Sequence, residues 1–137
     1  MNDGELEGGC LCGALRFRVS GPETSVCYCH CRSCRLAVGA PFVAWMTLPA
    51  SGFSLTRGEL ALCRSSQKVS RGFCASCGTS LTYAHEDRPD EIDVTLATLD
   101  EPGSLRPAWH IWTSDKPAWV VLADDLPQFT EWRRNSD

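Results

Sequence analysis

Short apolar stretches, separated by Gly, Pro and Ser, run along most of the chain. Residues 14–19 alternate apolar and polar side chains, and residues 92–96 repeat this alternation. A period of two predicts a strand with one buried face. Residues 42–48 are almost continuously apolar between two prolines, which predicts a strand buried on both faces or nearly so.

Further short segments rich in β-branched and aromatic residues complete the predicted strands. They cover residues 53–55, 60–63, 69–73, 79–83, 110–112 and 119–122. Helix is scarce, with one short helix predicted over 31–38, ended by Gly39, and another over 129–134. The polar stretch 85–91 predicts a surface loop. The chain is therefore expected to be all-β, built from antiparallel sheets with very little helix.

Length and charge narrow the class of protein. A chain of 137 residues without repeats or linkers predicts one domain over 1–137. The acidic start resembles no signal peptide, and no apolar run approaches the roughly 20 residues of a membrane helix. A net charge of −4 with scattered basic residues argues against a nucleic-acid or membrane partner. We expect a cytoplasmic protein; its oligomeric state is left open.

The nine cysteines change this picture most. A chain of this length can bury a sufficient core without disulfides, and an odd number of cysteines leaves one thiol unpaired. In a reducing compartment, clustered cysteines are more often metal ligands than disulfides. The spacing of the cysteines therefore needs a metal-binding explanation first.

Two of the cysteine pairs predict one structural zinc site. Cys74 and Cys77 form a C-x-x-C turn followed by Gly78, and Cys10 and Cys12 form a C-x-C pair flanked by glycines. Four thiolates in a tetrahedron are the usual ligands of structural zinc. A redox C-x-x-C pair is an alternative, but no thioredoxin-like βαβ pattern surrounds it. Buried structural cysteine is the other alternative.

A third cluster predicts a second, more reactive metal site. Cys29, Cys31 and Cys34 form C-x-C-x-x-C, and three thiolates on zinc leave a fourth position for water or substrate. Either Cys27 or His30 could instead complete a closed, purely structural site. His30 could also simply point away from the metal.

The remaining candidate residues have structural alternatives. Arg32 and Arg35 could favour thiolates or receive a substrate carboxylate, or could be solvated surface charges. Cys63 is expected to be a small core residue, and His85 and His110 are expected to be structural. Five tryptophans are expected in the core, at its rim or lining a pocket: Trp45, Trp109, Trp112, Trp119 and Trp132.

The combined motifs resemble the glutathione-dependent formaldehyde-activating enzyme family. The resemblance rests on Gly8-Gly9-Cys10-Leu11-Cys12-Gly13, on Cys29-His30-Cys31-Arg32-Ser33-Cys34-Arg35 with Gly39-Ala40-Pro41-Phe42, and on Ser70-Arg71-Gly72-Phe73-Cys74-Ala75-Ser76-Cys77-Gly78. Weaker similarity follows at residues 99–102 and 110–119. The likeness covers roughly residues 8–125 in order, and the full set is far more specific than any single motif.

The resemblance implies a fold, two metal sites and a reaction. The fold would be a tent-like arrangement of antiparallel sheets around a structural zinc, with a second zinc at the reactive site. The implied structural ligands are Cys10, Cys12, Cys74 and Cys77, and the implied reactive ligands are Cys29, Cys31 and Cys34. The founding activity joins glutathione and formaldehyde into S-hydroxymethylglutathione, a carbon–sulfur lyase reaction read in reverse. Many members have no demonstrated reaction.

The residues are compatible with this chemistry. A thiol or an aldehyde could bind at the open position of the second site, and a cation such as Arg32, Arg35 or Arg71 would offset the thiolate charge. Glutathione and an aldehyde are the expected small-molecule partners. Two rival functions stay open: a non-catalytic zinc-binding interaction module, and a thiol redox or metal-buffering protein.

Overall fold

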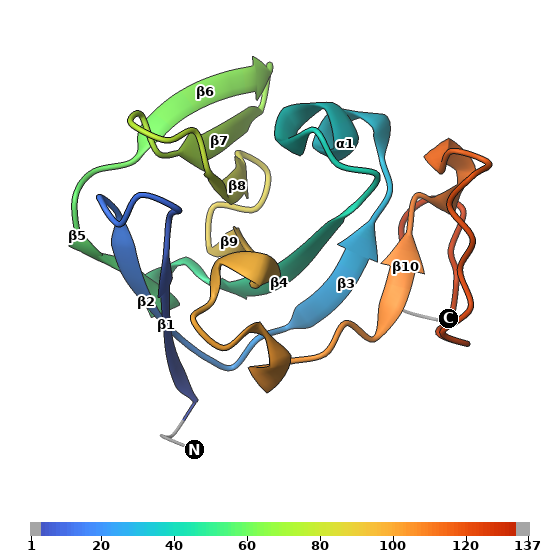
Figure 1. The fold of residues 1–137 in the computed structure, drawn as a ribbon, viewed down its shortest axis with the longest axis horizontal. Coiled ribbons are helices and arrows are strands. Elements are labelled where there is room, and N and C mark those ends of the chain that lie inside the picture. The colour runs from blue at the N-terminus through green and yellow to red at the C-terminus, as the bar shows by residue number, and fades with distance from the viewer. Residues whose placement is uncertain (1–3, 134–137) are drawn as a thin grey trace.

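Two β-sheets make up most of the structure, a computed structural model that describes residues 4–133. The smaller sheet has three antiparallel strands in the order β1-β2-β5. These strands are β1 (Glu5–Gly9), β2 (Arg16–Ser20) and β5 (Phe53–Arg57). Figure 1 shows this sheet to one side of the molecule, next to the larger sheet.

The larger sheet has seven strands in the order β10-β3-β4-β9-β8-β7-β6. Its strands are β3 (Ser25–Cys29), β4 (Val43–Pro49), β6 (Ala61–Ser66), β7 (Val69–Phe73), β8 (Ser80–His85), β9 (Glu91–Thr95) and β10 (Trp109–Ile111). Neighbouring strands are antiparallel except β10 and β3, which are parallel. The mostly-β prediction is confirmed, and the expectation of purely antiparallel pairing is corrected at this one edge.

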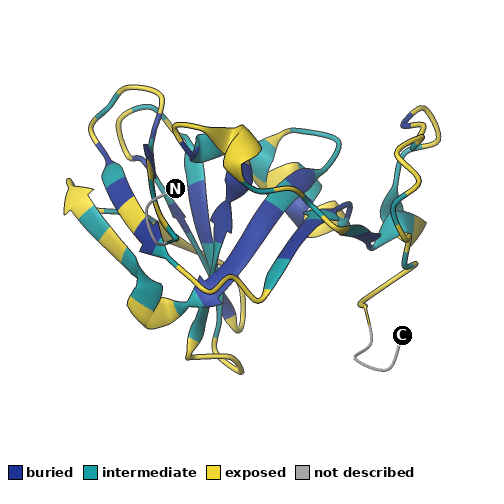
Figure 2. Ribbon diagram, turned by 90° about the horizontal axis from the view of Figure 1, so that it is seen from below, coloured by how far each residue is buried: buried dark blue, intermediate teal, exposed yellow. Residues whose placement is uncertain are grey.

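The main core lies between the two sheets. Phe17 on β2 packs in the same buried cluster as Met46 on β4 and Val94 on β9. Residues Val43 and Trp45 of β4 belong to a second buried cluster on the other side of the larger sheet. Strand β4 is therefore buried on both faces, as its continuous apolar run predicts, and Figure 2 shows buried residues concentrated in the middle strands.

One short α-helix, α1 (Arg32–Val38), follows β3. It begins where the Sγ of Cys31 accepts a hydrogen bond from the Cys34 amide, so a cysteine takes the place of the usual N-cap oxygen. It ends at Gly39, whose φ of 68° lies in the left-handed region that only glycine adopts without strain. The predicted helix and its glycine stop are confirmed.

The C-terminal segment differs from the sequence-based expectation. Residues 119–122 form no strand, and residues 129–133 form no helix; residue 134 of the predicted helix lies outside the described residues. The chain instead runs beside β10, where the amide of Phe129 donates to the carbonyl of His110 at 2.9 Å. These inter-segment hydrogen bonds satisfy backbone groups that a helix would have paired internally. Trp119 is 72% exposed and is not a core residue.

Four one-turn 3-10 helices complete the described chain. They are η1 (Ala50–Gly52), η2 (Leu96–Thr98), η3 (Pro102–Ser104) and η4 (Thr113–Asp115). Within residues 4–133, no helix has the length and apolar character needed to cross a membrane.

Candidate metal centres and the adjoining cleft

The four-cysteine cluster joins the two sheets. Cys10 and Cys12 lie in the turn between β1 and β2, and Cys74 and Cys77 lie in the turn between β7 and β8. All four sulfur atoms lie within 4.8 Å of one another. The two turns thus meet although 61 residues separate Cys12 from Cys74 in the sequence. A metal ion held there would fasten the smaller sheet to the larger one.

The geometry of this cluster fits a tetrahedral metal site. Four sulfurs at about 2.3 Å from a central zinc are separated from one another by about 3.8 Å. The Sγ of Cys12 lies 3.7 Å from that of Cys10 and 3.8 Å from that of Cys74. Backbone amides also point at the sulfurs, because Leu15 donates to Cys10 at 3.2 Å and Cys77 donates to Cys74 at 3.4 Å. Such donors favour the thiolate form that metal binding requires.

Each cysteine turn is completed by a glycine in the left-handed region. Gly13 and Gly78 both have a φ of +82°. A side chain at this φ would be strained, so glycine is needed to reverse the chain directly after the sulfur-bearing turn.

The three-cysteine cluster forms where β3 runs into α1. Cys29 ends β3, Cys31 caps α1 and Cys34 lies in its first turn, with their three sulfurs within 4.8 Å of one another. Cys27 lies on the same face of β3, but its sulfur is not part of this close set. Burial raises the pKa of the Cys27 thiol to about 11. The structure thus brings together the three predicted cysteines and leaves Cys27 apart.

Among residues 4–133, Arg71 on β7 is the cation that reaches the three-cysteine cluster. Its two terminal nitrogens lie 3.7 and 3.8 Å from the Sγ of Cys34. The guanidinium also lies 5.0 Å from the centre of the Tyr83 ring, and its Nε donates to Ser65 Oγ at 3.1 Å. Arg71 is therefore held in place from both sides while it faces the sulfur.

The protonation of the three thiols is strongly interdependent. Hydrogen bonds from the other two cysteines and the charge of Arg71 lower the pKa of the Cys34 thiol far below its ordinary value. Hydrogen bonds to Cys31 and Cys34 raise the pKa of the Cys29 thiol well above it. One thiolate is thus stabilised by the protein itself. A metal ion would supply the positive charge needed to ionise the other two, so the donor set fits a metal.

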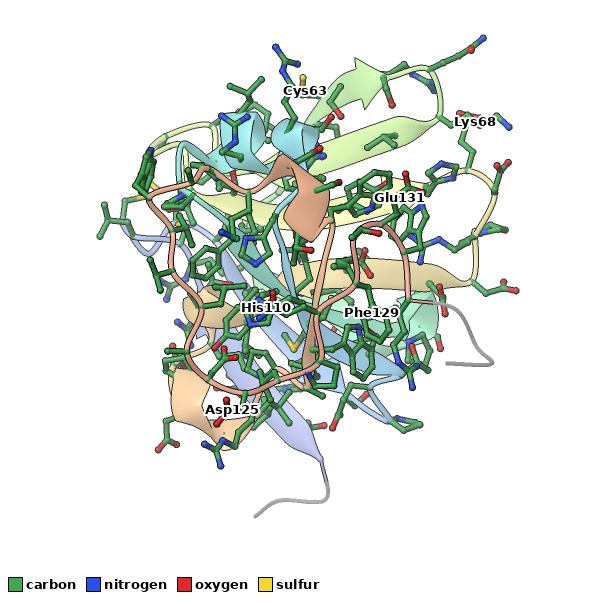
Figure 3. All side chains as sticks on the ribbon, turned by 90° about the vertical axis from the view of Figure 1, so that its right-hand side faces the viewer. Cys63, Lys68, His110, Asp125, Phe129 and Glu131 are labelled. Carbon is green, nitrogen blue, oxygen red and sulfur yellow. The ribbon has the colours of Figure 1, made fainter. Side chains whose placement is uncertain are left out.

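The other arginines and the isolated cysteine play different parts. Arg32 uses its backbone amide to bind Asp115 at 3.0 Å, and the Nε of Arg35 is buried without a partner among the described residues. Cys63 was expected in the core, but it is exposed on β6, the edge strand of the larger sheet. Figure 3 shows it at the periphery of the molecule. The apolar run around Cys63 suggests a buried strand, but β6 lies at the edge of the sheet and has a neighbouring strand on one side only.

A hydrogen-bonded chain of two buried histidines and one exposed aspartate adjoins the cluster. His110 Nε2 is 2.8 Å from Asp124 Oδ2, and its Nδ1 is 2.9 Å from His30 Nε2. When His110 is neutral and donates its Nε2 proton to the carboxylate, its Nδ1 accepts from Nε2 of His30. Burial and then the neighbouring His110 lower the pKa of His30 to about 4. His30 therefore points toward β10 and away from the sulfurs, and His110 lies beneath the C-terminal segment (Figure 3).

A cleft of about 830 Å³ opens over the three-cysteine cluster. Cys29, Cys31 and Cys34 line it, whereas none of the four cysteines of the other cluster does. Its apolar walls include Trp45, Tyr83, Trp109 and Trp112. Of the other cluster, Cys12 is exposed at the surface and Cys77 borders a separate, smaller hollow of about 380 Å³. The two clusters thus differ in the cleft they face as well as in ligand number.

Two polar residues of the cleft were missed by the sequence analysis. Asp93 and Thr47 lie opposite each other on β9 and β4, and Thr47 Oγ1 donates to Asp93 Oδ1 at 2.6 Å. Burial raises the pKa of Asp93 to about 6. The available signals were the polar Thr47 within the apolar run 42–48 and the polar positions of the alternating segment 92–96, which mark a face that does not belong to the main core.

Comparisons with known proteins agree with this architecture. Residues 5–115 match the family described as glutathione-dependent formaldehyde-activating enzyme. A Schizosaccharomyces pombe protein described as an uncharacterized lyase is 35% identical over 128 residues, which cover 92% of this chain and 91% of the relative. A Halomonas elongata protein, provisionally named a glutathione-dependent formaldehyde-activating enzyme, is 29% identical over 128 residues, which cover 85% of this chain and 80% of that protein.

A solved structure shares the fold. The crystal structure of a Rhodobacter sphaeroides protein superposes with a TM-score of 0.61 at 25% sequence identity. The match covers 74% of this chain and 92% of the other.

Fold and site together define a mostly-β protein with two cysteine clusters that could hold metal ions. The extent of the family match and the 35% identical relative then identify it more closely: the chain belongs to the glutathione-dependent formaldehyde-activating enzyme family. The resemblance seen in the sequence is confirmed. The family description and the lyase relative support an enzyme of the lyase type.

Proposed function

We propose that this protein is a zinc-dependent carbon–sulfur lyase that forms or breaks a thiol–aldehyde adduct such as S-hydroxymethylglutathione. The observation that carries the proposal is that the cluster with only three sulfur ligands lines the larger cleft. The three-cysteine cluster lines a cleft of about 830 Å³, and the four-cysteine cluster does not. Three ligands facing a cleft are typical of a catalytic zinc site, and four closed ligands are typical of a structural one.

The two zinc ions would have separate duties. The structural zinc would be held by Cys10, Cys12, Cys74 and Cys77, and the reactive zinc by Cys29, Cys31 and Cys34. When bound, the reactive zinc would lower the pKa of an incoming thiol or polarise an aldehyde oxygen.

The net reaction needs positive charge, orientation and a dry site. A carbon–sulfur bond forms between the thiol sulfur and the aldehyde carbon, and the thiol proton ends on the aldehyde oxygen. Arg71 places a positive charge 3.7 Å from Cys34, where negative charge collects. The aromatic walls formed by Trp45 and Tyr83 would give the reactants an apolar surface on which to be held together.

Turnover should depend on the three-cysteine cluster and not on cysteine content in general. We would measure glutathione-dependent loss of formaldehyde above the spontaneous rate, comparing wild type with Cys31→Ser and with Cys63→Ser. Cys63 is exposed and lies outside both clusters, so it is a matched control. Loss of the enzymatic rate in Cys31→Ser alone is the expected result. Equal rates in all three proteins would remove the proposed catalytic role.

A thiol redox or metal-buffering function is the second candidate. It is favoured by Cys27, which is buried in the same cluster of residues as Cys29 and Cys34 but lies outside the close set of sulfurs. A reversible disulfide would need Cys27 to pair with one of its neighbours. If both zinc ions stay bound during mild oxidation, the result argues against this function. If oxidation releases one zinc ion and removes two free thiols in the same step, the result favours it.

A further inference from the structure

A row of polar side chains crosses the larger sheet on the face that lines the cleft. Residues directly opposite one another on adjacent strands project to the same face. The registers place Arg71 opposite Tyr83, Tyr83 opposite Asp93, Asp93 opposite Thr47, and Thr47 opposite Ser25. All five line the cleft. A positive charge and a negative charge thus lie two strands apart on one continuous surface.

Asp93 is the unusual member of this row. Its side chain is only 14% exposed, and among residues 4–133 its one hydrogen bond comes from Thr47 Oγ1, to Oδ1. The nearest cation to Oδ2 is Arg88 at 3.9 Å, whose other terminal nitrogen is bound to Glu91 at 2.9 Å. A largely buried carboxylate whose charge is only partly paired destabilises the folded protein, because it has lost its hydration without full compensation.

A purely structural role does not explain this cost. Strands β4 and β9 are already joined by backbone pairing from Trp45–Thr95 to Pro49–Glu91, so the Thr47–Asp93 hydrogen bond adds little to their register. Oδ2 keeps accepting capacity on the side of the cleft. A ligand ammonium group would complete the pairing, and Arg88 beside it could receive a carboxylate of the same ligand.

The spacing matches an amino-acid headgroup on a small peptide thiol. Arg71 and Asp93 are separated by two strand spacings, or about 10 Å between backbones. The α-amino group of glutathione is separated from its sulfur by a chain of comparable reach, on the order of 7–10 Å when extended. Between the two ends, the ligand would cross Tyr83, whose ring already stacks under Arg71.

We propose that Asp93 and Arg88 bind the α-amino-acid headgroup of the thiol substrate, the ammonium on Asp93 and the carboxylate on Arg88. The inference rests on the proposed function for its choice of glutathione as ligand. It assigns the specificity for that ligand to the β8–β9 side of the cleft, at a distance from the cysteines that carry the chemistry.

The test is a binding measurement that needs no turnover. Isothermal titration of zinc-loaded protein would compare glutathione with its desamino analogue, glutaryl-cysteinyl-glycine, which keeps the thiol and lacks the ammonium group. Wild type should bind glutathione at least about ten-fold more tightly, because the analogue leaves Asp93 unpaired. Asp93→Asn should bind the two ligands equally. Thr47→Val keeps the carboxylate and should retain the preference.

Arg88→Gln provides a second, independent variant. It should weaken glutathione binding several-fold while leaving the preference for the amino group intact. Equal binding of the two ligands by wild type would overturn the inference whether or not Asp93→Asn folds. A preference that persists in Asp93→Asn would also overturn it, leaving Asp93 with a structural role.

The same data separate this inference from the proposed function. A ten-fold preference that depends on Asp93, with no consumption of formaldehyde, would support the headgroup site and contradict the lyase. Turnover of formaldehyde without such a preference would support the lyase and contradict the headgroup site. Failure of both ligands to bind would overturn the headgroup site and remove glutathione as the thiol.

Discussion

Replacing Asp93 by Asn should make the protein more stable at neutral pH, an uncommon result for a buried polar residue. Burial raises the pKa of Asp93 to about 6 from an ordinary value of 3.8. Each pKa unit corresponds to about 1.4 kcal/mol, so ionised Asp93 destabilises the folded state by about 3 kcal/mol above pH 7. Asn can still accept the hydrogen bond from Thr47, although it carries a desolvation cost of its own. We expect a gain of about 1–3 kcal/mol.

The pH dependence gives the sharper test. Because the folded pKa is raised, the folded protein binds more protons than the unfolded chain between about pH 4 and 6. The contribution of Asp93 to stability therefore falls as pH rises through this window. The cost of ionised Asp93 should shrink from about 3 kcal/mol at pH 7.5 to about 1 kcal/mol at pH 4.5, and the advantage of Asp93→Asn should shrink with it.

Urea denaturation of zinc-loaded protein, followed by tryptophan fluorescence at several pH values, measures this difference. Asp90→Asn is the matched control, because Asp90 is exposed in the turn directly before β9 and should change stability by less than about 0.5 kcal/mol. A destabilised Asp93→Asn at pH 7.5, or an advantage independent of pH, would refute the reasoning and assign Asp93 a stabilising role in the sheet.

Three further perturbations follow from the geometry. Cys74→Ser should lower stability by several kcal/mol and release one zinc, whereas Cys34→Ser should abolish turnover with a much smaller loss of stability. The reason is that only the four-cysteine cluster joins the two sheets. Thermal unfolding with zinc analysis measures both effects, and similar melting temperatures for the two variants would contradict this expectation. Arg71→Met should reduce kcat/KM by roughly ten- to a hundred-fold, because it removes the positive charge beside Cys34. Arg71→Lys keeps the charge and should reduce kcat/KM by less. Equal rates in the two variants would exclude an effect of the charge. Gly78→Ala should lower the free energy of unfolding by about 1–2 kcal/mol, because the φ of Gly78 is +82°. Gly103→Ala is the control and should be close to neutral, because Gly103 has no such φ and open space around it. Equal urea midpoints for the two variants would show that the turn at Gly78 tolerates a side chain.

Local pattern predicted the elements whose environment is uniform along their length. The apolar run 42–48 is buried on both faces because β4 lies between the main core and the cleft cluster. The helix over 32–38 and its stop at Gly39 follow from local capping geometry. The two cysteine clusters also follow from spacing, since each predicted set is brought within 4.8 Å.

What the sequence did not predict depends on contacts between distant segments. Strand β1 lacks a strong apolar pattern and is defined by its pairing with β2. The segment after residue 119 has strand-like and helix-like composition, yet its backbone bonds go to β10 and to neighbouring turns. Cys63 could not be placed because exposure on β6 depends on that strand lying at the edge. Asp93 acquires its role only from the cross-strand row.

The choice among the candidate arginines was likewise a matter of tertiary structure. Arg32 and Arg35 are close to the cysteines in sequence, and Arg32 lines the cleft, but among residues 4–133 neither side chain is hydrogen-bonded to a cluster sulfur. Arg71 lies 37 residues from Cys34 in the chain and reaches its sulfur from β7. Sequence proximity to a ligand is therefore a weak guide to the charges that surround it.

The central claim is that Cys29, Cys31 and Cys34 hold a zinc ion with a position open to the cleft. Anomalous X-ray scattering at the zinc edge from crystals of the zinc-loaded protein tests it directly. We expect two peaks per chain, one among Cys10, Cys12, Cys74 and Cys77, and one among the three cleft cysteines with no further protein ligand. A second peak also ligated by Cys27 or His30, or a single peak at the four-cysteine cluster in fully loaded protein, would contradict it.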